Sequence, residues 1–285
     1  MMNTKSSGVI SLLLVGIFFG ISGPIAKYLS AWINPYQAVA LRFGIAFLFT
    51  LIISIFKKSK SLGEVNKKDL LFFSIVFPVS VIFFTLAVFN TKVSLAIFSF
   101  YIANLLSSFA FGKLFLNEKV NQTKLISLTL IIIALTFFTN VFNGFSLDKG
   151  FIFGLISGVL QTVTSIFQKK LNGLDRLNLV KIQTLTGLIF AIIFMGVTGT
   201  LWLPALTIQA MVVSLVYGLL FLIISYLLLV GFQKTDINIG SMLVSTELFF
   251  GPLFAYLMFK ESLTTPEIIG SILVIIAVIN INRKK

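Results

Sequence analysis

The chain alternates between long apolar segments and short polar connections. Each apolar segment has about the 20 residues that a helix needs to cross a bilayer. The segments are too long and too uniformly apolar to be the alternating strands of a membrane barrel, so we expect helices. The pattern predicts an all-α integral membrane protein with ten transmembrane helices, at residues 8–28, 36–56, 69–89, 94–116, 123–142, 150–170, 178–199, 207–231, 237–259 and 265–282.

Composition supports the membrane assignment and excludes several functions. Hydrophobic residues make up 58% of the 285 residues and charged residues 11%, whereas soluble domains have roughly 45–50% and about 25%. This excludes an ordinary soluble domain, a disordered chain and a nucleic-acid-binding domain. The chain has no Cys and no His, so it lacks the usual zinc and haem ligands and a Ser–His–Asp triad. No Gly-Lys-Ser or Gly-Lys-Thr sequence indicates a phosphate-binding loop, and we predict no enzyme activity, cofactor or metal.

The basic residues predict the orientation. With both termini in the cytoplasm, 17 of the 22 Lys and Arg residues fall at the inner ends of the segments, as the positive-inside rule expects. The net charge of +13 therefore indicates topology and attraction to anionic lipid rather than to nucleic acid. The basic run 57–68 is most simply an anchor at the inner surface. We expect a multi-pass protein of a prokaryotic cytoplasmic membrane, with the first helix retained.

The two halves of the chain resemble each other at a shift of 142–143 residues. The segment Gly8–Gly16 aligns with Gly150–Gly158, and Asn104–Glu118 aligns with Glu247–Glu261. Chance similarity between apolar helices is the alternative, but glycines and acidic residues match at a nearly constant offset. Because each half has five helices, an odd number, the halves would enter the membrane in opposite senses. The sequence predicts two inverted five-helix repeats, at residues 1–142 and 143–285, as in many secondary transporters.

These features resemble the EamA-like branch of the drug/metabolite transporter superfamily. The resemblance covers the whole chain and rests on the Pro35…Arg42 start of the second helix, and on Glu118 and Glu261, which each precede the last helix of a half. It implies ten helices in two inverted repeats, a central cavity, cytoplasmic termini and transport of small metabolites such as amino acids. The chain departs from the repeat at Thr184, where the alignment would place an arginine, and carries Glu247 where many relatives are apolar or small.

Two polar residues near the membrane centre are the first candidates for a site. Glu247 lies about ten residues into its segment, where a carboxylate must be protonated, paired or in contact with water. It could couple transport to protons or bind a cationic group, or it could simply donate an interhelical hydrogen bond. Its repeat partner Asn104 shares a helical face with Tyr101 and Ser108. This face could line a cavity, although Asn and Ser also join packed helices.

The first and sixth helices each carry a face of small or polar residues. In the first helix, Gly20 and Gly23 allow close approach, and Pro24 frees a backbone carbonyl that could bind substrate or form part of a gate. Tight packing alone would explain the same residues. The sixth helix has a neutral hydrogen-bonding face that could form a cavity wall, composed of Gln161, Ser165 and Gln168.

Basic and aromatic residues near the outer side provide further candidates. Arg42 lies roughly 10 Å into its helix and could pair with a substrate carboxylate or close an outer gate. Lys27 is a weaker candidate, and both could instead extend to the outer headgroups. Tyr217 is expected to reach the cavity. We interpret most of the 32 Phe residues as lipid-facing or packing surface and not as an aromatic recognition site, and Glu118 and Glu261 as groups that cap or neutralise helix ends.

Taken together, the sequence predicts a secondary transporter of a small polar metabolite, working by alternating access. Export of a solute such as an amino acid is the leading interpretation, with protons as a candidate coupling ion. A lipid-carrier flippase of the same architecture is the alternative, and a lateral apolar slot instead of an enclosed polar pocket would distinguish it. The substrate, the direction, the coupling ion and the choice between monomer and homodimer are left open by the sequence.

Overall fold

The computed structural model describes residues 4–56, 66–91, 93–139, 148–202, 204, 206–260 and 264–283. The predicted boundary between the halves at 142–143, most of the basic run 57–68 and Glu261 lie outside these residues. The regular elements within them are helices: α1 (Thr4–Leu29), α2 (Pro35–Phe56), α3 (Lys67–Asn90), α4 (Val93–Leu116), α5 (Gln122–Thr139), α6 (Lys149–Lys170), α7 (Arg176–Val197), α8 (Ile208–Lys234), α9 (Ile237–Val244), α10 (Glu247–Phe259) and α11 (Thr265–Arg283).

The helices follow the predicted segments, with one difference. Eight apolar stretches in the described residues are long enough to cross a membrane, and α5 and α11 contain shorter apolar stretches. The chain is therefore a multi-pass membrane protein by length and composition of its helices. The difference lies in the predicted ninth segment, which is not one helix but two, α9 and α10, interrupted at Ser245 and Thr246.

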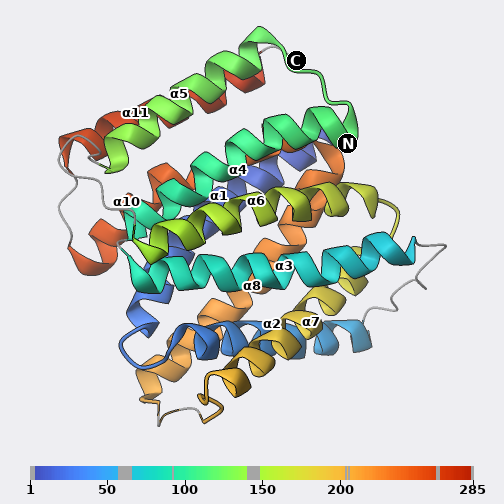
Figure 1. The fold of residues 1–285 in the computed structure, drawn as a ribbon, viewed down its shortest axis with the longest axis vertical. Helices are drawn as coiled ribbons and strands as arrows, with labels where there is room; N and C mark the ends of the chain where they lie inside the picture. The colour runs from blue at the N-terminus through green and yellow to red at the C-terminus, as the bar shows by residue number, and fades with distance from the viewer. Residues whose placement is uncertain are drawn as a thin grey trace.

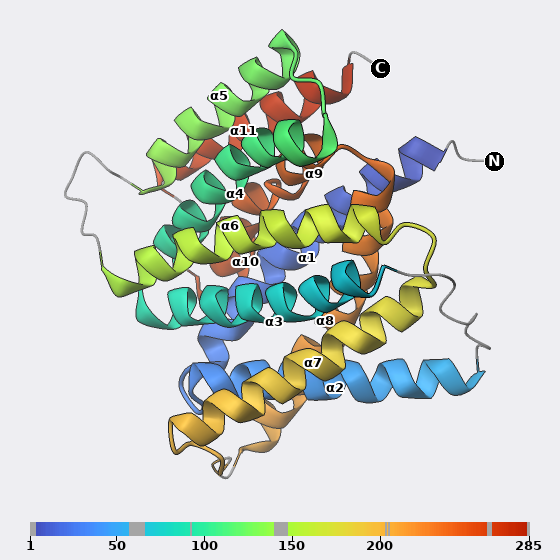
Figure 2. The ribbon, with the colours of Figure 1, turned by 45° about the vertical axis from the view of Figure 1, so that its right-hand side comes forward.

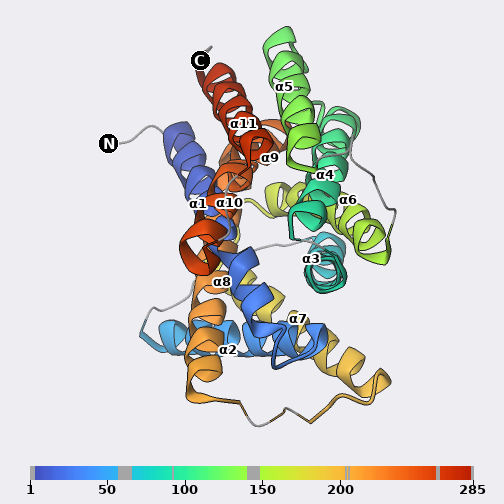
Figure 3. The ribbon, with the colours of Figure 1, turned by 90° about the vertical axis from the view of Figure 1, so that its left-hand side faces the viewer.

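The helices form a bundle with two pairs at its edges. Helices α5 and α11 pack together at one edge, and α2 and α7 pack together near the other (Figures 1 and 3). Between them, α3 and α6 run side by side (Figure 2). Helices α1, α4, α8, α9 and α10 complete this central part, so residues that face the middle of the bundle come from both halves of the chain.

Large apolar side chains cover the outside of the bundle. On α2, Leu48, Ile52 and Ile55 are 59%, 48% and 78% exposed, and α7 exposes Ile189 and Ile193 in the same way. Extended apolar patches are rare on soluble monomers but are expected where lipid is the solvent. The composition of these surfaces therefore agrees with a bilayer around the edge helices.

The contacts between the two halves are reciprocal. Helix α1 packs against α8 and α10, and its counterpart in the second half, α6, packs against α3 and α4. Likewise α2 packs against α7 and α8, and α7 packs against α2 and α3. If the helices of one half are exchanged for their counterparts in the other half, each of these helix–helix contacts becomes one that the structure also contains.

Glycine positions show the same reciprocity at atomic detail. A Cβ atom on Gly16 would meet the Val244 carbonyl and the Glu247 amide nitrogen of the second half. A Cβ atom on Gly158 would meet the Phe100 carbonyl and the amide nitrogen of Asn104 in the first half. Asn104 and Glu247, aligned by the sequence repeat, thus occupy equivalent places beside equivalent glycines.

We expect the substitution Gly158→Ala to destabilise the protein, because the added methyl group would overlap the backbone of α4. Overpacking of this kind costs about 1–3 kcal/mol. The control is Gly196→Ala in the same half, since nothing lies within 4 Å of a Cβ atom there and alanine favours a helix. Thermal unfolding in detergent, followed by size-exclusion chromatography, should show a lower midpoint for Gly158→Ala alone. Equal midpoints would contradict the close approach of α4 and α6.

Candidate functional site

A cavity lies in the middle of the bundle and is lined by both halves. Its walls come from α1, α2, α3, α4, α6, α8 and α10. The lining residues are Phe19, Ser22, Arg42, Phe77, Ser80, Val81, Phe84, Phe100, Ser157, Gln161, Phe221, Ile224, Leu228 and Glu247.

Glu247 reaches the cavity from the first turn of α10, directly after the interruption. The hydroxyls of Ser245 and Thr246 donate to the carbonyls of Met242 and Leu243, at 2.7 and 2.8 Å, and such local bonds compete with helix hydrogen bonding. The amide of Leu248 then bonds to the Ser245 carbonyl, three residues back. The local sequence therefore bends the chain and releases the carbonyl of Val244.

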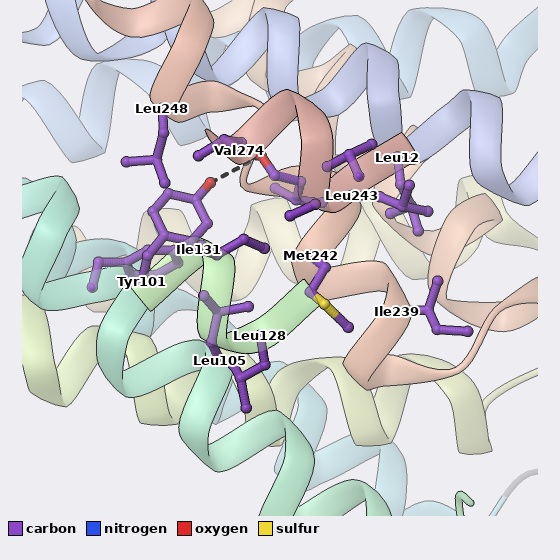
Figure 4. Close-up of a cluster of buried hydrophobic side chains, with 14 of the residues drawn as sticks. Leu12, Tyr101, Leu105, Leu128, Ile131, Ile239, Met242, Leu243, Leu248 and Val274 are labelled. Carbon is purple, nitrogen blue, oxygen red and sulfur yellow. Dashed lines mark hydrogen bonds between the residues drawn. The ribbon is translucent and has the colours of Figure 1, made fainter. Parts of the chain in front are cut away.

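Tyr101 occupies the position that this bend creates. The hydroxyl of Tyr101 lies 3.1 Å from the freed Val244 carbonyl and 2.5 Å from Oε2 of Glu247. Both oxygens are within hydrogen-bonding distance of this donor. The tyrosine ring is completely buried in an apolar cluster with Leu105, Ile131 and Leu248 (Figure 4). The cluster fixes the hydroxyl beside the carboxyl group, so Glu247 is held by a neutral partner.

Glu247 is 2% exposed, and no salt bridge to it occurs in the described part of the chain. A carboxyl group in such surroundings binds either a proton or a cation when it loses contact with water. Because Glu247 lies beside the cavity, its carboxyl group can hold a proton, or it can accept hydrogen bonds from an ammonium group.

Arg42 reaches the same cavity from α2 and is 4% exposed. Its Nη1 atom donates to the hydroxyl of Tyr217 at 2.7 Å, and the guanidinium carbon lies 4.7 Å from the ring centroids of Tyr217 and Phe221. These contacts orient the guanidinium group by cation–π attraction but supply no negative charge. Among the described residues, no carboxylate pairs with Arg42, and no salt bridge joins Arg42 to Glu247.

The sequence interpretation did not anticipate the walls of the cavity. Five phenylalanines line it, although we interpreted most phenylalanines as lipid-facing or packing surface and none as part of a recognition site: Phe19, Phe77, Phe84, Phe100 and Phe221. Three serines also line it, at positions 22, 80 and 157, and Ser80 and Ser157 join α3 to α6 by a hydrogen bond of 2.8 Å. Phenylalanine is too frequent in this chain for any one of them to give a signal in the sequence.

The structure places Asn104 between helices and outside the cavity lining. Its amide nitrogen lies 3.1 Å from Oγ1 of Thr162 and 3.3 Å from the Gly158 carbonyl, so it connects α4 to α6. Ser108 donates to the Leu105 carbonyl of its own helix at 2.8 Å. Asn104 therefore joins two packed helices, which is the alternative that the sequence left open for this face, whereas the bond of Ser108 stays within α4.

The polar face of α6 is divided between the cavity and the interior of the bundle. Gln161 lines the cavity, whereas Ser165 donates to the Gln161 carbonyl at 3.0 Å. Gln168 is completely buried, and its amide atoms have no hydrogen-bond partner within the described structure. Of the three residues, only Gln161 is at the cavity here.

The candidates of α1 are used mainly for packing. A Cβ atom on Gly20 would overlap Phe250 and the backbone of Gly251 in α10, so this glycine permits the α1–α10 contact. Gly23 lies near Val93 at the start of α4. Helix α1 continues through the buried Pro24, and Lys27 is exposed in its last turn.

Charged residues connect the helix ends on the side of the bundle opposite to Lys27. Glu118 is 7% exposed and accepts hydrogen bonds from the Ile237 amide and from Nζ of Lys169, both at 2.8 Å. Asp236 pairs with Lys124 at 2.9 Å. Glu118 therefore caps the beginning of α9 and joins it to the end of α6.

Comparison with known proteins agrees with this arrangement. Residues 6–140 and 148–283 each match the profile of the EamA-like transporter family. A solved structure titled "Crystal structure of protein" has the same fold, with a TM-score of 0.80 and 12% sequence identity over 97% of this chain and 96% of that one. No curated protein sequence matches the chain. Because the family profile matches twice and together covers nearly the whole sequence, the chain belongs to the EamA-like transporter family, within the drug/metabolite transporter superfamily.

Proposed function

We propose that this chain is a secondary transporter that exports a small zwitterionic metabolite, such as an amino acid, across the cytoplasmic membrane. The observation that carries the proposal is the cavity, which presents one arginine and one glutamate that are not paired with each other. Opposite charges buried in one cavity favour a solute that carries both an anionic and a cationic group.

Each wall of the cavity has a role in this proposal. The Arg42 guanidinium binds the substrate carboxylate, because it offers planar donors and has no carboxylate partner among the described residues. Glu247 binds the ammonium group or, in its absence, a proton. The phenylalanines enclose an apolar side chain, so we expect amino acids such as leucine and phenylalanine to be better substrates than glycine.

We propose alternating access between two inverted five-helix repeats as the mechanism. The reciprocal packing of the halves supports it, since each half can adopt the arrangement of the other with equivalent contacts. Opposite directions of α1 and α6 across the bundle also support it, as the colour gradient in Figures 1 and 2 makes visible. Coupling to protons would then follow from Glu247, which exchanges a proton for the substrate ammonium.

The flippase alternative is less well supported by the cavity. A lipid carrier needs an apolar slot that admits acyl or polyprenyl chains, and charges placed in the middle of such a slot would be costly. Arg42 and Glu247 both face the cavity and are almost completely buried. These groups fit a compact polar solute better than a chain of hydrocarbon.

Counterflow in sealed liposomes tests the proposed function. Purified protein is reconstituted in liposomes that are loaded with a mixture of unlabelled amino acids, and uptake of labelled leucine, phenylalanine, glycine and glutamate is followed. We expect accumulation of leucine or phenylalanine and little of the other two. Accumulation of none of the four, together with movement of a fluorescent lipid between leaflets, would overturn the proposal in favour of a flippase.

A further inference from the structure

Gln183 on α7 occupies the position that Arg42 occupies on α2. The register is fixed by matching helix caps: the Gln37 amide donates to Oδ1 of Asn34 at 2.9 Å, and the Asn178 amide donates to Oδ1 of Asp175 at 3.1 Å. Arg42 is the eighth residue after its cap, and Gln183 is the eighth residue after its own. The caps therefore pair Arg42 with Gln183, not with Thr184 as the sequence alignment suggested.

The helices α8 and α3, which pack against α2 and α7, also carry positions that correspond to each other. Helices α3 and α8 end alike, with the amide of Thr91 bonded to Ala87 and that of Thr235 bonded to Gly231. Counted back from these caps, Tyr217 and Phe221, which hold Arg42, correspond to Phe73 and Phe77.

The equivalent positions share one core. Phe73, Phe77 and Phe221 belong to one buried cluster, and Phe77 also lines the cavity. Helix α7 packs against α3 as α2 packs against α8. The side of α7 that carries Gln183 therefore has the same relation to the bundle as the side of α2 that carries Arg42.

Gln183 has an unused hydrogen-bonding capacity. It is completely buried, and neither its amide oxygen nor its amide nitrogen has a partner within the described structure. A buried amide without partners is costly, on the order of 1–3 kcal/mol. Packing alone would be served better by an apolar residue of the same size, so the amide is available to a partner that another conformation brings to it.

With the orientation that the basic residues predict, α2 begins at the outer surface and α7 at the cytoplasmic surface. We infer that Gln183 becomes a substrate-binding residue in the inward-facing conformation that exchange of the two halves would produce, where it donates to the substrate carboxylate as we propose for Arg42 in the conformation described. The inference rests on the proposed transport function and on exchange of the two halves between conformations. Because an amide is neutral and a guanidinium is charged, the two conformations would hold the carboxylate with unequal strength. Gln183 would thereby set the affinity on the cytoplasmic side separately from that on the outer side.

Single cysteines test this inference, because the natural chain has no Cys. The variants are Gln183→Cys, Ser22→Cys in the cavity wall, and Thr184→Cys as the matched control. Thr184 is equally buried beside Gln183, but its hydroxyl donates to the Val180 carbonyl of its own helix. A membrane-impermeant cationic thiosulfonate is applied separately to the inside and to the outside of membrane vesicles.

We expect Gln183→Cys to react from the cytoplasmic side, with protection by leucine, and Thr184→Cys to stay unreactive from both sides. Reaction of Ser22→Cys together with protection of Gln183 by leucine would support the inference. If Ser22→Cys reacts and Gln183→Cys does not react from the cytoplasmic side, the inference is wrong while the proposed transporter stands. Reaction of neither, with no leucine counterflow in the unmodified chain, would instead overturn the transport proposal and this inference with it.

Transport kinetics give a second readout for a variant that retains the volume of the side chain. Gln183→Met should raise KM for leucine presented on the cytoplasmic side by roughly tenfold or more, the effect expected for one lost hydrogen bond to a charged carboxylate. KM on the outer side should stay unchanged. An equal change on both sides would show a structural role for Gln183 and would contradict the inference.

Discussion

Replacement of Glu247 by glutamine should abolish accumulation of leucine driven by an inside-acid pH gradient, while exchange of leucine across the membrane continues. Glutamine keeps the size and the hydrogen-bonding capacity toward Tyr101 but cannot bind and release a proton. The proposed coupling depends on that proton, because Glu247 has only the neutral hydroxyl of Tyr101 as a hydrogen-bond partner and no salt-bridge partner among the described residues. We expect accumulation to fall from well above equilibrium to the level that exchange alone produces.

The matched control is Tyr101→Phe, which removes the hydroxyl beside Glu247 and keeps the buried ring. This variant should still accumulate leucine in response to the gradient, since its carboxyl group is intact, although the pH dependence of the rate should change. If Glu247→Gln accumulates leucine as well as the unmodified chain, Glu247 is not the proton-binding group and has a structural role. If neither the variant nor the unmodified chain accumulates leucine above equilibrium, the protein is a facilitator.

Substitution of Arg42 by glutamine should weaken leucine binding by roughly 10- to 150-fold. A hydrogen bond to a charged group contributes about 1.5–3 kcal/mol, which corresponds to this range. Glutamine also imitates the residue at the equivalent position of α7, so it tests directly whether a neutral amide suffices in this conformation. Measurement of leucine binding to purified protein in detergent gives the ratio of dissociation constants.

Two comparisons separate binding from folding in this experiment. Isopentylamine has the leucine side chain and ammonium group but no carboxylate, so its binding should be nearly equal in the unmodified protein and in Arg42→Gln. Arg42→Lys retains the charge but loses the planar donors, and we expect an intermediate loss for leucine. Equal weakening of leucine and isopentylamine would show that Arg42 supports the fold through Tyr217 and Phe221 and does not bind the carboxylate.

The local sequence was sufficient to predict the features that depend only on residues close together in the chain. The apolar segments gave the helices within a few residues, since a helix of about 20 apolar residues is the stable form of such a segment in lipid. The interruption between α9 and α10 also has a local cause in Ser245 and Thr246, but paired hydroxyls occur in many continuous helices. The bend became evident only with Tyr101, which bonds to the carbonyl that the bend frees.

The candidate site residues also fall into two groups: those that the sequence identified and those whose role only the structure decided. The position of Glu247 near the middle of an apolar segment already singled it out, because an acidic residue there is costly in any fold. Asn104 is the counterexample: it aligns with Glu247 and has a similar polarity, yet it bonds to Gly158 and Thr162 between helices. Which of two polar residues faces a cavity depends on the partner helix, and no feature of their own segments records that.

The sequence by itself determined that the chain is a multi-pass membrane protein of one transporter family, because hydrophobic length and repeated motifs are properties of the chain read in order. The tertiary structure decided which side chains meet. It placed Arg42 and Glu247 in one phenylalanine-walled cavity and left Gln183 buried without a partner. These relations join residues far apart in the chain, and their physical basis is the packing of helices from one half against helices of the other.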